Sequence, residues 1–222
     1  MPKLGVPADV EAIRKAISEA LDQMDEQGRR IGDSRFGVYA FFDYDGEPIY
    51  VGQTKEKLRV RIRRHLTNHR TDAVAMNVLD PFEVADIEMW PLWELEDMNA
   101  ASAAQMLNAA EFTVFQKVLA QSSFNAVLNE KDIVGSESVV LPPSVRIRII
   151  PAELFEVRKH PDIRIARRAS TIASLAKVIS ERDVSPGLRR TLITQARRLE
   201  HLARRRFGDF AGEPIEVDHG QE

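Results

Sequence analysis

The stretch FGVYAFFDYDGEPIYVGQTKEKLRVRIRRHL, residues 36–66, decides the fold of this chain. Two apolar runs, 36–42 and 48–52, are joined through DYDGE, and an Asp-Gly pair between such runs is a strong signal for a β-hairpin. Each run places a tyrosine next to a glycine, and glycine inside a strand usually marks a close approach of backbone. Plain packing of the tyrosines would also explain the hairpin, so the segment after residue 57 is the more informative one.

A helix is predicted from Leu58 to about Arg70, directly after the hairpin. At about 100° per residue, its apolar stripe consists of Leu58, Ile62 and Leu66. Arg61 and His65 fall within or beside this stripe, whereas Arg63 points away from it. Because a desolvated guanidinium needs a negative partner, Arg61 is expected to meet an anion or a buried acid.

A second helix, predicted for residues 98–121, places a carboxylate on an apolar face. Glu111 lies four residues after Leu107 and three before Val114, which are on that face. A carboxylate in this position is costly unless it is paired or binds a cation. The two explanations are an ion pair between Glu111 and Arg61 and a cation site, and the helix pattern alone favours the ion pair.

Together these residues resemble the GIY-YIG nuclease family. The elements of the resemblance, in chain order, are Gly37-Val38-Tyr39, Tyr50-Val51-Gly52, Thr54, Arg61, His65, Glu111 and Phe124-Asn125. Valine stands for isoleucine at positions 38 and 51, which keeps a β-branched side chain in each strand. The resemblance covers about residues 35–130, and its specificity comes from the order and spacing of the elements, since three-residue motifs occur by chance.

The resemblance implies an α+β fold in which a small three-stranded antiparallel sheet is flanked by helices. It also implies hydrolysis of DNA phosphodiester bonds with one divalent cation, Mg²⁺ or Mn²⁺. The metal-binding glutamate of the family falls on Glu111, and its phosphate-contacting arginine falls on Arg61. A fixed guanidinium suits this reaction because it offers paired donors to the charge that builds on the phosphate oxygens.

The remaining family positions fall on Tyr39, Tyr50, His65 and Asn125. The resemblance implies that the two tyrosines and the histidine position or activate the attacking water, and that Asn125 supports the site from the end of the long helix. A tyrosine hydroxyl has a reference pKa of about 10, and histidine one of about 6.5, so either group is a candidate base once its surroundings adjust it. The sequence does not choose between them.

The charge of the chain is divided unevenly. Residues 1–157 carry 17 basic and 25 acidic side chains, residues 158–206 carry 14 and 4, and residues 207–222 carry none and 5. Such a basic block can follow a phosphate backbone. We expect it to bind double-stranded DNA through Arg197, Arg198, Arg204 and Arg205. The rival interpretation is that the block docks on the acidic N-terminal region.

The predicted domain organisation has five segments: 1–34, an N-terminal helix; 35–130, the nuclease-like core; 131–144, a linker containing Pro142-Pro143; 145–208, a basic helical region; and 209–222, a loose acidic tail. Within them, the expected elements are helices at 8–30, 162–181 and 186–207, a third strand at 82–92 and a possible short strand at 145–150. The boundary rests on the polar, proline-containing composition before residue 144.

Composition excludes several classes of protein. There is no cysteine, which excludes disulfides and thiolate metal sites. No apolar run approaches the roughly 20 residues of a membrane span, and the first 13 residues lack the apolar core of a signal peptide. We expect a cytoplasmic protein without a membrane partner. The alternatives to a DNA endonuclease are a nucleic-acid-binding module with an inactive site and a toxin or effector nuclease that acts on RNA.

Overall fold

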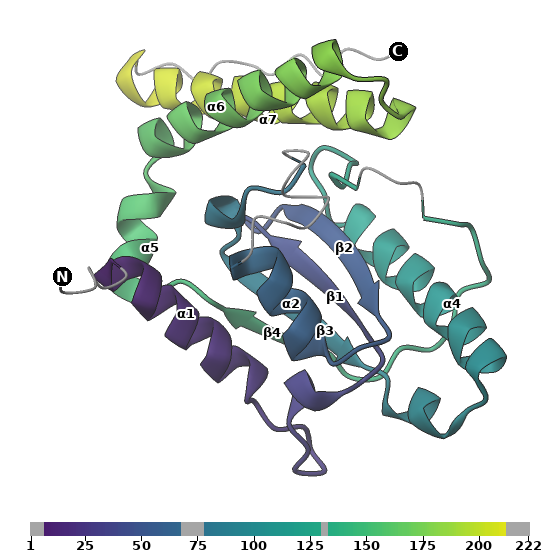
Figure 1. Cartoon of the computed structure of the whole chain (residues 1–222). Coiled ribbons are helices and arrows are strands. Elements are labelled where there is room, and N and C mark those ends of the chain that lie inside the picture. Colours follow the sequence, from purple (N-terminus) through teal and green to yellow (C-terminus); the bar gives the residue numbers. More distant parts are fainter. Residues whose placement is uncertain (1–6, 68–77, 130–132, 212–222) are drawn as a thin grey trace, which may run out of the picture.

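The structure is a computed structural model, and it describes residues 7–67, 78–129 and 133–211. Its centre is an antiparallel sheet with the strand order β2-β1-β3-β4 (Figure 1). The strands are β1 (Gly37–Phe42), β2 (Pro48–Thr54), β3 (Asp86–Pro91) and β4 (Val145–Arg148). The prediction of three strands was therefore wrong, because the short run after the double proline pairs with β3 and extends the sheet.

The register follows from the side-chain pattern of the strands. Tyr39 lies opposite Gly52 in the β1–β2 hairpin, and Ile87 lies opposite Ile147 in the added β3–β4 pair. Gly46 occupies the turn of the hairpin with φ +81°, a conformation that glycine adopts without strain. Apolar residues and arginines alternate along β4, so its apolar side chains point to one face of the sheet and its arginines point to the other, which is exposed to solvent.

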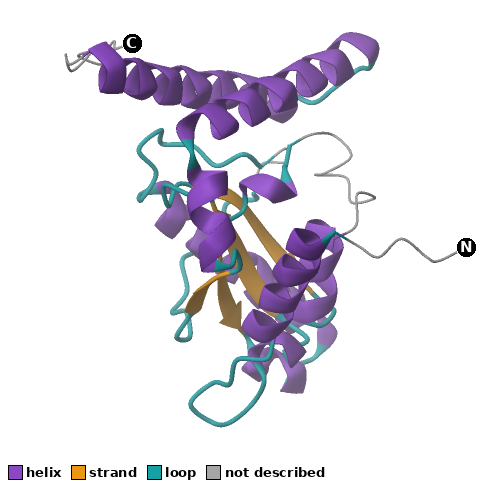
Figure 2. Ribbon diagram, turned by 90° about the vertical axis from the view of Figure 1, so that its left-hand side faces the viewer, coloured by secondary structure: helices purple, strands orange, loops and turns teal. Residues whose placement is uncertain are grey.

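Helices cover both faces of the sheet (Figure 2). On one face, α1 (Ala8–Leu21) and α2 (Leu58–Thr67) pack against Tyr39, Phe41 and Ile87. The predicted end of α2 near Arg70 lies outside the described residues. On the other face, α4 (Ala100–Leu119) packs on Val38, Ala40 and Val51. The α4 helix begins at Asn99, whose side chain accepts a hydrogen bond from the backbone N–H of Ser102.

The first helix is shorter than predicted. It ends at Leu21 instead of continuing to Arg30, because Asp25 begins a tight turn. One carboxylate oxygen of Asp25 accepts hydrogen bonds from the backbone N–H groups of Gln27 and Arg29, which stabilises the turn in place of further helix. The chain then returns beside itself, and the backbone N–H of Ile31 donates to the carbonyl of Gln23.

The C-terminal region forms three helices, α5 (Ala152–Lys159), α6 (Pro161–Glu181) and α7 (Pro186–Ala211). The α6 and α7 helices lie side by side across the end of the sheet where the β1–β2 hairpin turns (Figures 1 and 2). Their residues Leu175 and Leu188 are buried and join the same core cluster as α1 and α2. The basic region is thus packed onto the rest of the molecule through apolar contacts as well as charge.

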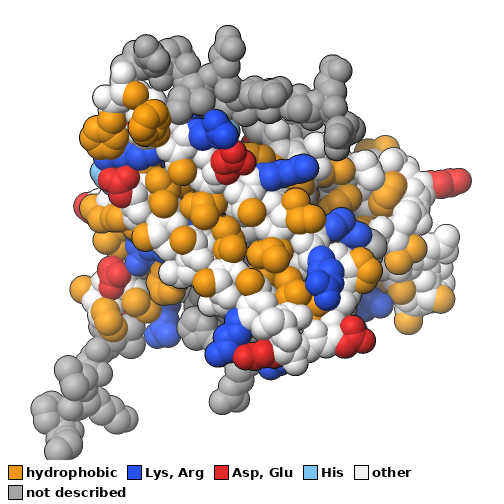
Figure 3. Space-filling model, turned by 90° about the horizontal axis from the view of Figure 1, so that it is seen from above, with side chains coloured by type: hydrophobic (Ala, Val, Ile, Leu, Met, Phe, Trp, Pro, Cys, Tyr) orange, Lys and Arg blue, Asp and Glu red, His pale blue; other side chains and the backbone are white. Residues whose placement is uncertain are grey.

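The outward face of the α6–α7 pair is not a continuous basic surface. Seen from above, apolar side chains cover much of it, with basic side chains between and around them (Figure 3). The large apolar side chains exposed on these two helices include Ile163, Ile193, Phe207 and Phe210. The longest helices are nevertheless too polar to cross a membrane, and this holds for every helix in the described part of the chain.

Candidate active site

The glycines of the two tyrosine–glycine motifs make room for named neighbours. A Cβ atom at Gly52 would lie 2.6 Å from the Oη atom of Tyr39, across the hairpin, and a Cβ atom at Gly37 would lie 2.9 Å from the side chain of Leu58. The first glycine therefore lets the Tyr39 ring lie flat on β2, and the second lets α2 begin directly against β1. Both arrangements place α2 close to the two tyrosines.

Three rings meet between α2 and the sheet. The ring centroids of His65 and Tyr50 are 5.3 Å apart, those of His65 and Tyr39 are 5.9 Å apart, and those of the two tyrosines are 6.3 Å apart. Tyr39 is fully buried, and His65 is 2% exposed. Because Tyr39 and Tyr50 point to the same side of the hairpin, the sequence predicts this proximity once the register is known.

Arg61 lies one helical turn before His65 and is half-buried, as the phase of α2 predicts. Its Nε atom is buried and has no hydrogen-bond partner, and Arg61 makes no ion pair with any residue that the structure describes. Burial alone would lower the pKa of Arg61, but Tyr39, Tyr50 and Glu56 raise it on balance. The guanidinium therefore stays charged and keeps a donor free for a ligand.

The two candidate bases differ in their protonation. Burial, and after it the charges of Arg61 and Arg64, lower the pKa of His65 to about 4, so this histidine is neutral at physiological pH. Burial, followed by the nearby Tyr50 hydroxyl, raises the pKa of Tyr39 well above its usual value. By strict hydrogen-bond geometry, the Tyr39 hydroxyl and both ring nitrogens of His65 are buried without partners among the described residues, although the Arg61 guanidinium lies close enough to the Tyr39 hydroxyl to interact with it.

Glu111 approaches the edge strand β2 from the other face of the sheet. The Nε2 atom of Gln53, on β2, donates a hydrogen bond of 2.9 Å to Oε2 of Glu111. Burial raises the pKa of Glu111, and the amides of Gln53 and the charge of Arg61 oppose this. The ion pair between Glu111 and Arg61 that the helix pattern favoured is not formed, yet the two groups are near enough to influence each other electrostatically.

We call Tyr39, Tyr50, Arg61, His65 and Glu111 the edge cluster, because they gather around β2, which lies at one edge of the sheet. It brings together five of the six residues that the sequence assigned to catalysis. Buried donors and acceptors without partners are rare in proteins and call for an explanation. In the edge cluster a bound ligand would supply that explanation.

The sixth residue, Asn125, lies apart from the edge cluster. It is exposed in a turn after α4, with φ +47°, a conformation that asparagine tolerates better than most residues. Asn129 makes the contact with the signature strand instead: its side-chain amide donates to the carbonyl of Val51 at 2.8 Å and accepts from the N–H of Val51 at 3.1 Å. The sequence analysis missed Asn129 and Gln53, and only the position of Gln53 directly after Gly52 hinted at a role.

The oxygen atoms of Glu111 and of its neighbour Gln53 fit a hard divalent cation. Glu111 supplies a carboxylate, and the Oε1 atom of the adjacent Gln53 is a buried oxygen without a hydrogen-bond partner. No group of three or more histidine, cysteine or acidic side chains suited to a metal occurs within residues 7–67, 78–129 and 133–211. One carboxylate with neutral oxygens suits a cation such as Mg²⁺, which keeps most of its waters.

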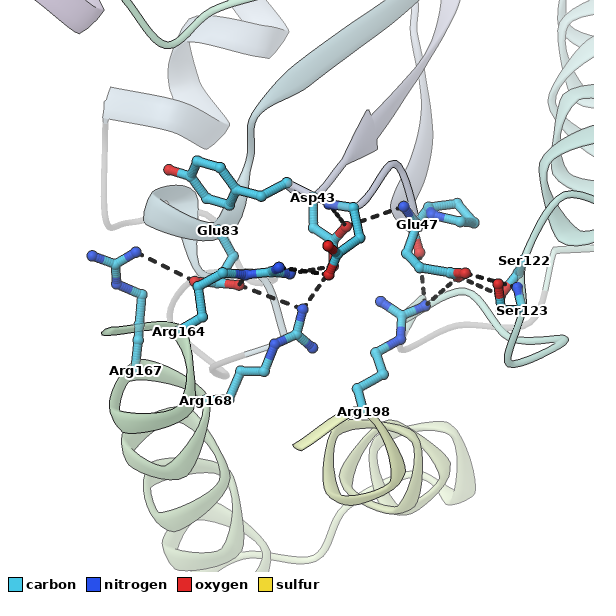
Figure 4. A network of polar contacts seen from close by, with 12 residues as sticks. Asp43, Glu47, Glu83, Ser122, Ser123, Arg164, Arg167, Arg168 and Arg198 are labelled. Carbon is cyan, nitrogen blue, oxygen red and sulfur yellow. Dashed lines mark hydrogen bonds and ion pairs between the residues drawn. The ribbon is translucent and has the colours of Figure 1, made fainter. Parts of the chain in front are cut away.

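A second set of charges, most of them buried, lies at the hairpin turn, under α6 and α7 (Figure 4). We call it the turn network, and it consists of Asp43, Asp45, Glu47, Glu83, Arg164, Arg167, Arg168 and Arg198. Arg164 and Arg168 donate to Oδ2 of Asp43 at 3.1 and 2.7 Å, and both also lie within 4 Å of Glu83. Arg164, Arg168 and Asp43 are almost completely buried. Part of the basic block therefore neutralises the acidic hairpin turn.

The four arginines assigned to DNA do not share one environment. Arg198 is 3% exposed, and it donates to the carbonyls of Pro48 and Ala126 at 2.9 and 3.0 Å. Arg198 therefore belongs to the row of α7 that faces the sheet, and its buried guanidinium is already bound to backbone carbonyls. Arg197, Arg204 and Arg205 are exposed.

A comparison with known protein families finds a match over part of the chain. Residues 35–95 match the family model of the GIY-YIG catalytic domain. No curated protein and no solved structure matches the chain. The matched segment contains Tyr39, Tyr50, Arg61 and His65, and Glu111 lies beyond it. The resemblance seen in the two tyrosine–glycine motifs is thus confirmed for residues 35–95, which match the catalytic domain of a family of endonucleases and imply a nuclease-type function.

Proposed function

We propose that this protein is a metal-dependent endonuclease that hydrolyses phosphodiester bonds of DNA, with the edge cluster as its active site. The observation that carries the proposal is the gathering of Arg61 and His65 beside the two signature tyrosines, with Glu111 within electrostatic reach of Arg61 and with buried polar atoms that have no partner in the described residues. Such a concentration of perturbed titratable groups is typical of catalytic sites.

In this proposal Arg61 binds the non-bridging oxygens of the scissile phosphate. Its Nε atom has no hydrogen-bond partner among the described residues, and the guanidinium stays protonated because its pKa is raised. The guanidinium can then stabilise the negative charge that develops in the transition state without moving. Glu111 would hold the divalent cation, which when bound supplies charge neutralisation to the leaving oxygen.

His65 is the better proton acceptor of the two candidates. Its lowered pKa keeps the imidazole neutral, whereas burial keeps the hydroxyl of Tyr39 protonated. A pKa of about 4 makes this imidazole a weak base, and the negative charge of a bound phosphate would raise that pKa and strengthen the base. The imidazole would then take a proton from the attacking water, directly or through a neighbouring hydroxyl. Tyr39 and Tyr50 would position that water.

The substitution Glu111→Ala tests the proposal on supercoiled plasmid with Mg²⁺. We expect nicking to be abolished while DNA binding, measured by fluorescence anisotropy, is retained, because the carboxylate serves the cation and not the fold. Glu94→Ala, which removes an exposed acid outside the edge cluster, is the matched control and should cleave normally. Nicking at the wild-type rate by the Glu111→Ala protein would remove Glu111 from the site.

A further inference from the structure

The amide of Gln53 is held in one orientation. Its Nε2 atom donates to Oε2 of Glu111 at 2.9 Å and to Oδ1 of Asn108 at 2.8 Å. An ionised carboxylate can only accept hydrogen bonds, so the nitrogen of Gln53, and not its oxygen, must face Glu111. Both N–H groups of the amide are used in these two contacts.

This orientation leaves the carbonyl oxygen of Gln53 without a partner. Oε1 is buried and accepts no hydrogen bond from any residue that the structure describes. An unpaired acceptor in the interior is costly, so the oxygen is expected to meet a group that the chain itself does not provide. The oxygen belongs to the same side chain that is bonded to Glu111, next to the edge cluster.

We propose that Oε1 of Gln53 is a second protein ligand of the divalent cation held by Glu111. Hard divalent cations are bound by carboxylate oxygens and by amide carbonyl oxygens, and this pair of side chains offers one of each. The inference rests on the proposed function, because it takes Glu111 as the first ligand. It assigns Gln53 two tasks: its nitrogen orients the carboxylate, and its oxygen binds the cation.

Two simpler roles for Gln53 compete with this one. Gln53 could serve only to orient Glu111 through Nε2, or its oxygen could accept from a buried water. The substitution Gln53→Met distinguishes these two roles from direct binding of the cation. Methionine keeps the length of the side chain and has a thioether in place of the amide group. Sulfur is a poor ligand for Mn²⁺ and a good one for a soft cation such as Cd²⁺.

The experiment is titration calorimetry of the full chain with Mn²⁺ and with Cd²⁺, in the absence of DNA. For Gln53→Met we expect the affinity for Mn²⁺ to fall about ten-fold, on the scale seen when groups around a metal are altered, and the affinity for Cd²⁺ to fall much less. Equal losses for the two cations would mean that Gln53 only orients Glu111, and no loss would mean that it has no part in binding. Either result overturns the proposal.

Three further variants serve as controls for this experiment. Gln105→Met makes the same exchange at an exposed position of α4 and should bind both cations like the wild type. Gln53→Glu restores an oxygen and should bind Mn²⁺ at least as tightly as the wild type, so a loss as large as that of Gln53→Met also counts against the proposal. This second variant keeps the test valid if Gln53→Met folds poorly, which a thermal melt would show.

The third protein, Glu111→Ala, separates this inference from the proposed function. If it abolishes Mn²⁺ binding while Gln53→Met has no effect, the function stands and Gln53 is not a ligand. If Glu111→Ala binds Mn²⁺ like the wild type, or if the wild type itself binds no cation, the cation is not held at Glu111 and both proposals fail.

Discussion

Arginines that are buried or half-buried occur at two places around the same β-hairpin, and their partners differ. In the turn network, Arg164 and Arg168 are bonded to Asp43 and lie against Glu83. In the edge cluster, Arg61 has no ion pair with a residue in the described part of the chain, and its Nε atom is free. The Nε atoms of Arg164 and Arg168 also lack hydrogen bonds, so the difference lies in the ion pairs. The charges of the first arrangement are paired inside the protein, whereas the charge of Arg61 favours an anion from outside.

The difference shows that a buried arginine indicates function only after its partners are counted. Charge that is compensated inside the protein contributes to the fold, because removing one partner leaves the other uncompensated. Charge that has no internal partner favours an anion from outside, and a phosphate is such an anion. The basic block of residues 158–206 must be divided by this criterion before any of it is assigned to DNA.

The largest expected effect comes from breaking the turn network. Asp43→Ala leaves Arg164 and Arg168 without their shared carboxylate and should cost about 3–5 kcal/mol of the free energy of unfolding. Chemical denaturation measures this directly. Glu200→Ala, which removes an exposed partner of Arg204, is the control and should leave the unfolding midpoint nearly unchanged. An Asp43→Ala protein as stable as the wild type would show that the network is not a brace.

The edge cluster should respond to pH through His65. Its folded pKa is lowered to about 4 from an ordinary value of 6.5, so the unfolded chain takes up the proton first as the pH falls. Stability that His65 contributes is therefore fully present above pH 6.5 and is lost as the pH falls towards 4, by at most about 1.4 kcal/mol per pH unit.

The substitution His65→Phe removes this titration while keeping a ring in the same place. The unfolding free energies of the two proteins are measured from pH 7.5 to 4.5. Below pH 6.5 the wild type should lose stability relative to the variant. Other groups that titrate in this range cancel in the difference. Parallel curves would mean that His65 is protonated as easily in the folded protein as in the unfolded one.

The smallest expected effect concerns the exposed arginines of α7. If Arg197, Arg204 and Arg205 contact DNA, changing them to glutamine should flatten the slope of log affinity against log salt by about 0.9 for each contact with a phosphate. The change Arg198→Gln should lower the melting temperature without altering that slope, since Arg198 is bonded to Pro48 and Ala126. An unchanged slope in the triple variant would remove these three arginines from the DNA contact.

Local pattern was sufficient to predict the hairpin and the phase of α2. The Asp-Gly turn and the 100° periodicity are properties of a short stretch, so they placed His65 in the interior and Arg61 beside it. The same reasoning placed Glu111 on the sheet side of α4, although its hydrogen-bond partner, Gln53, lies 58 residues earlier in the chain. Partners at such distances are set by packing and leave no periodic signal.

The errors have the same origin. The sheet was predicted with three strands because the double proline before the fourth resembles a linker, whereas the pairing of that strand with β3 depends on a free sheet edge. The burial of Arg198 was missed because the buried row of α7 is recognised in the sequence by its leucines. An arginine is tolerated in that row only where backbone carbonyls accept its hydrogen bonds and Glu47 lies near its charge. Charge counts cannot locate such acceptors.

Two matched substitutions test the division of labour between the two regions most directly. Arg61→Lys and Arg168→Lys each keep the charge and remove the planar guanidinium. For each protein, plasmid nicking with Mg²⁺ at about 25 °C and the melting temperature are measured together. We predict that Arg61→Lys lowers turnover at least ten-fold, about 1.4 kcal/mol or more in the barrier, at an unchanged melting temperature, and that Arg168→Lys lowers the melting temperature while cleavage below it stays normal. The reverse pattern, or equal effects of the two substitutions on both measurements, would contradict this division.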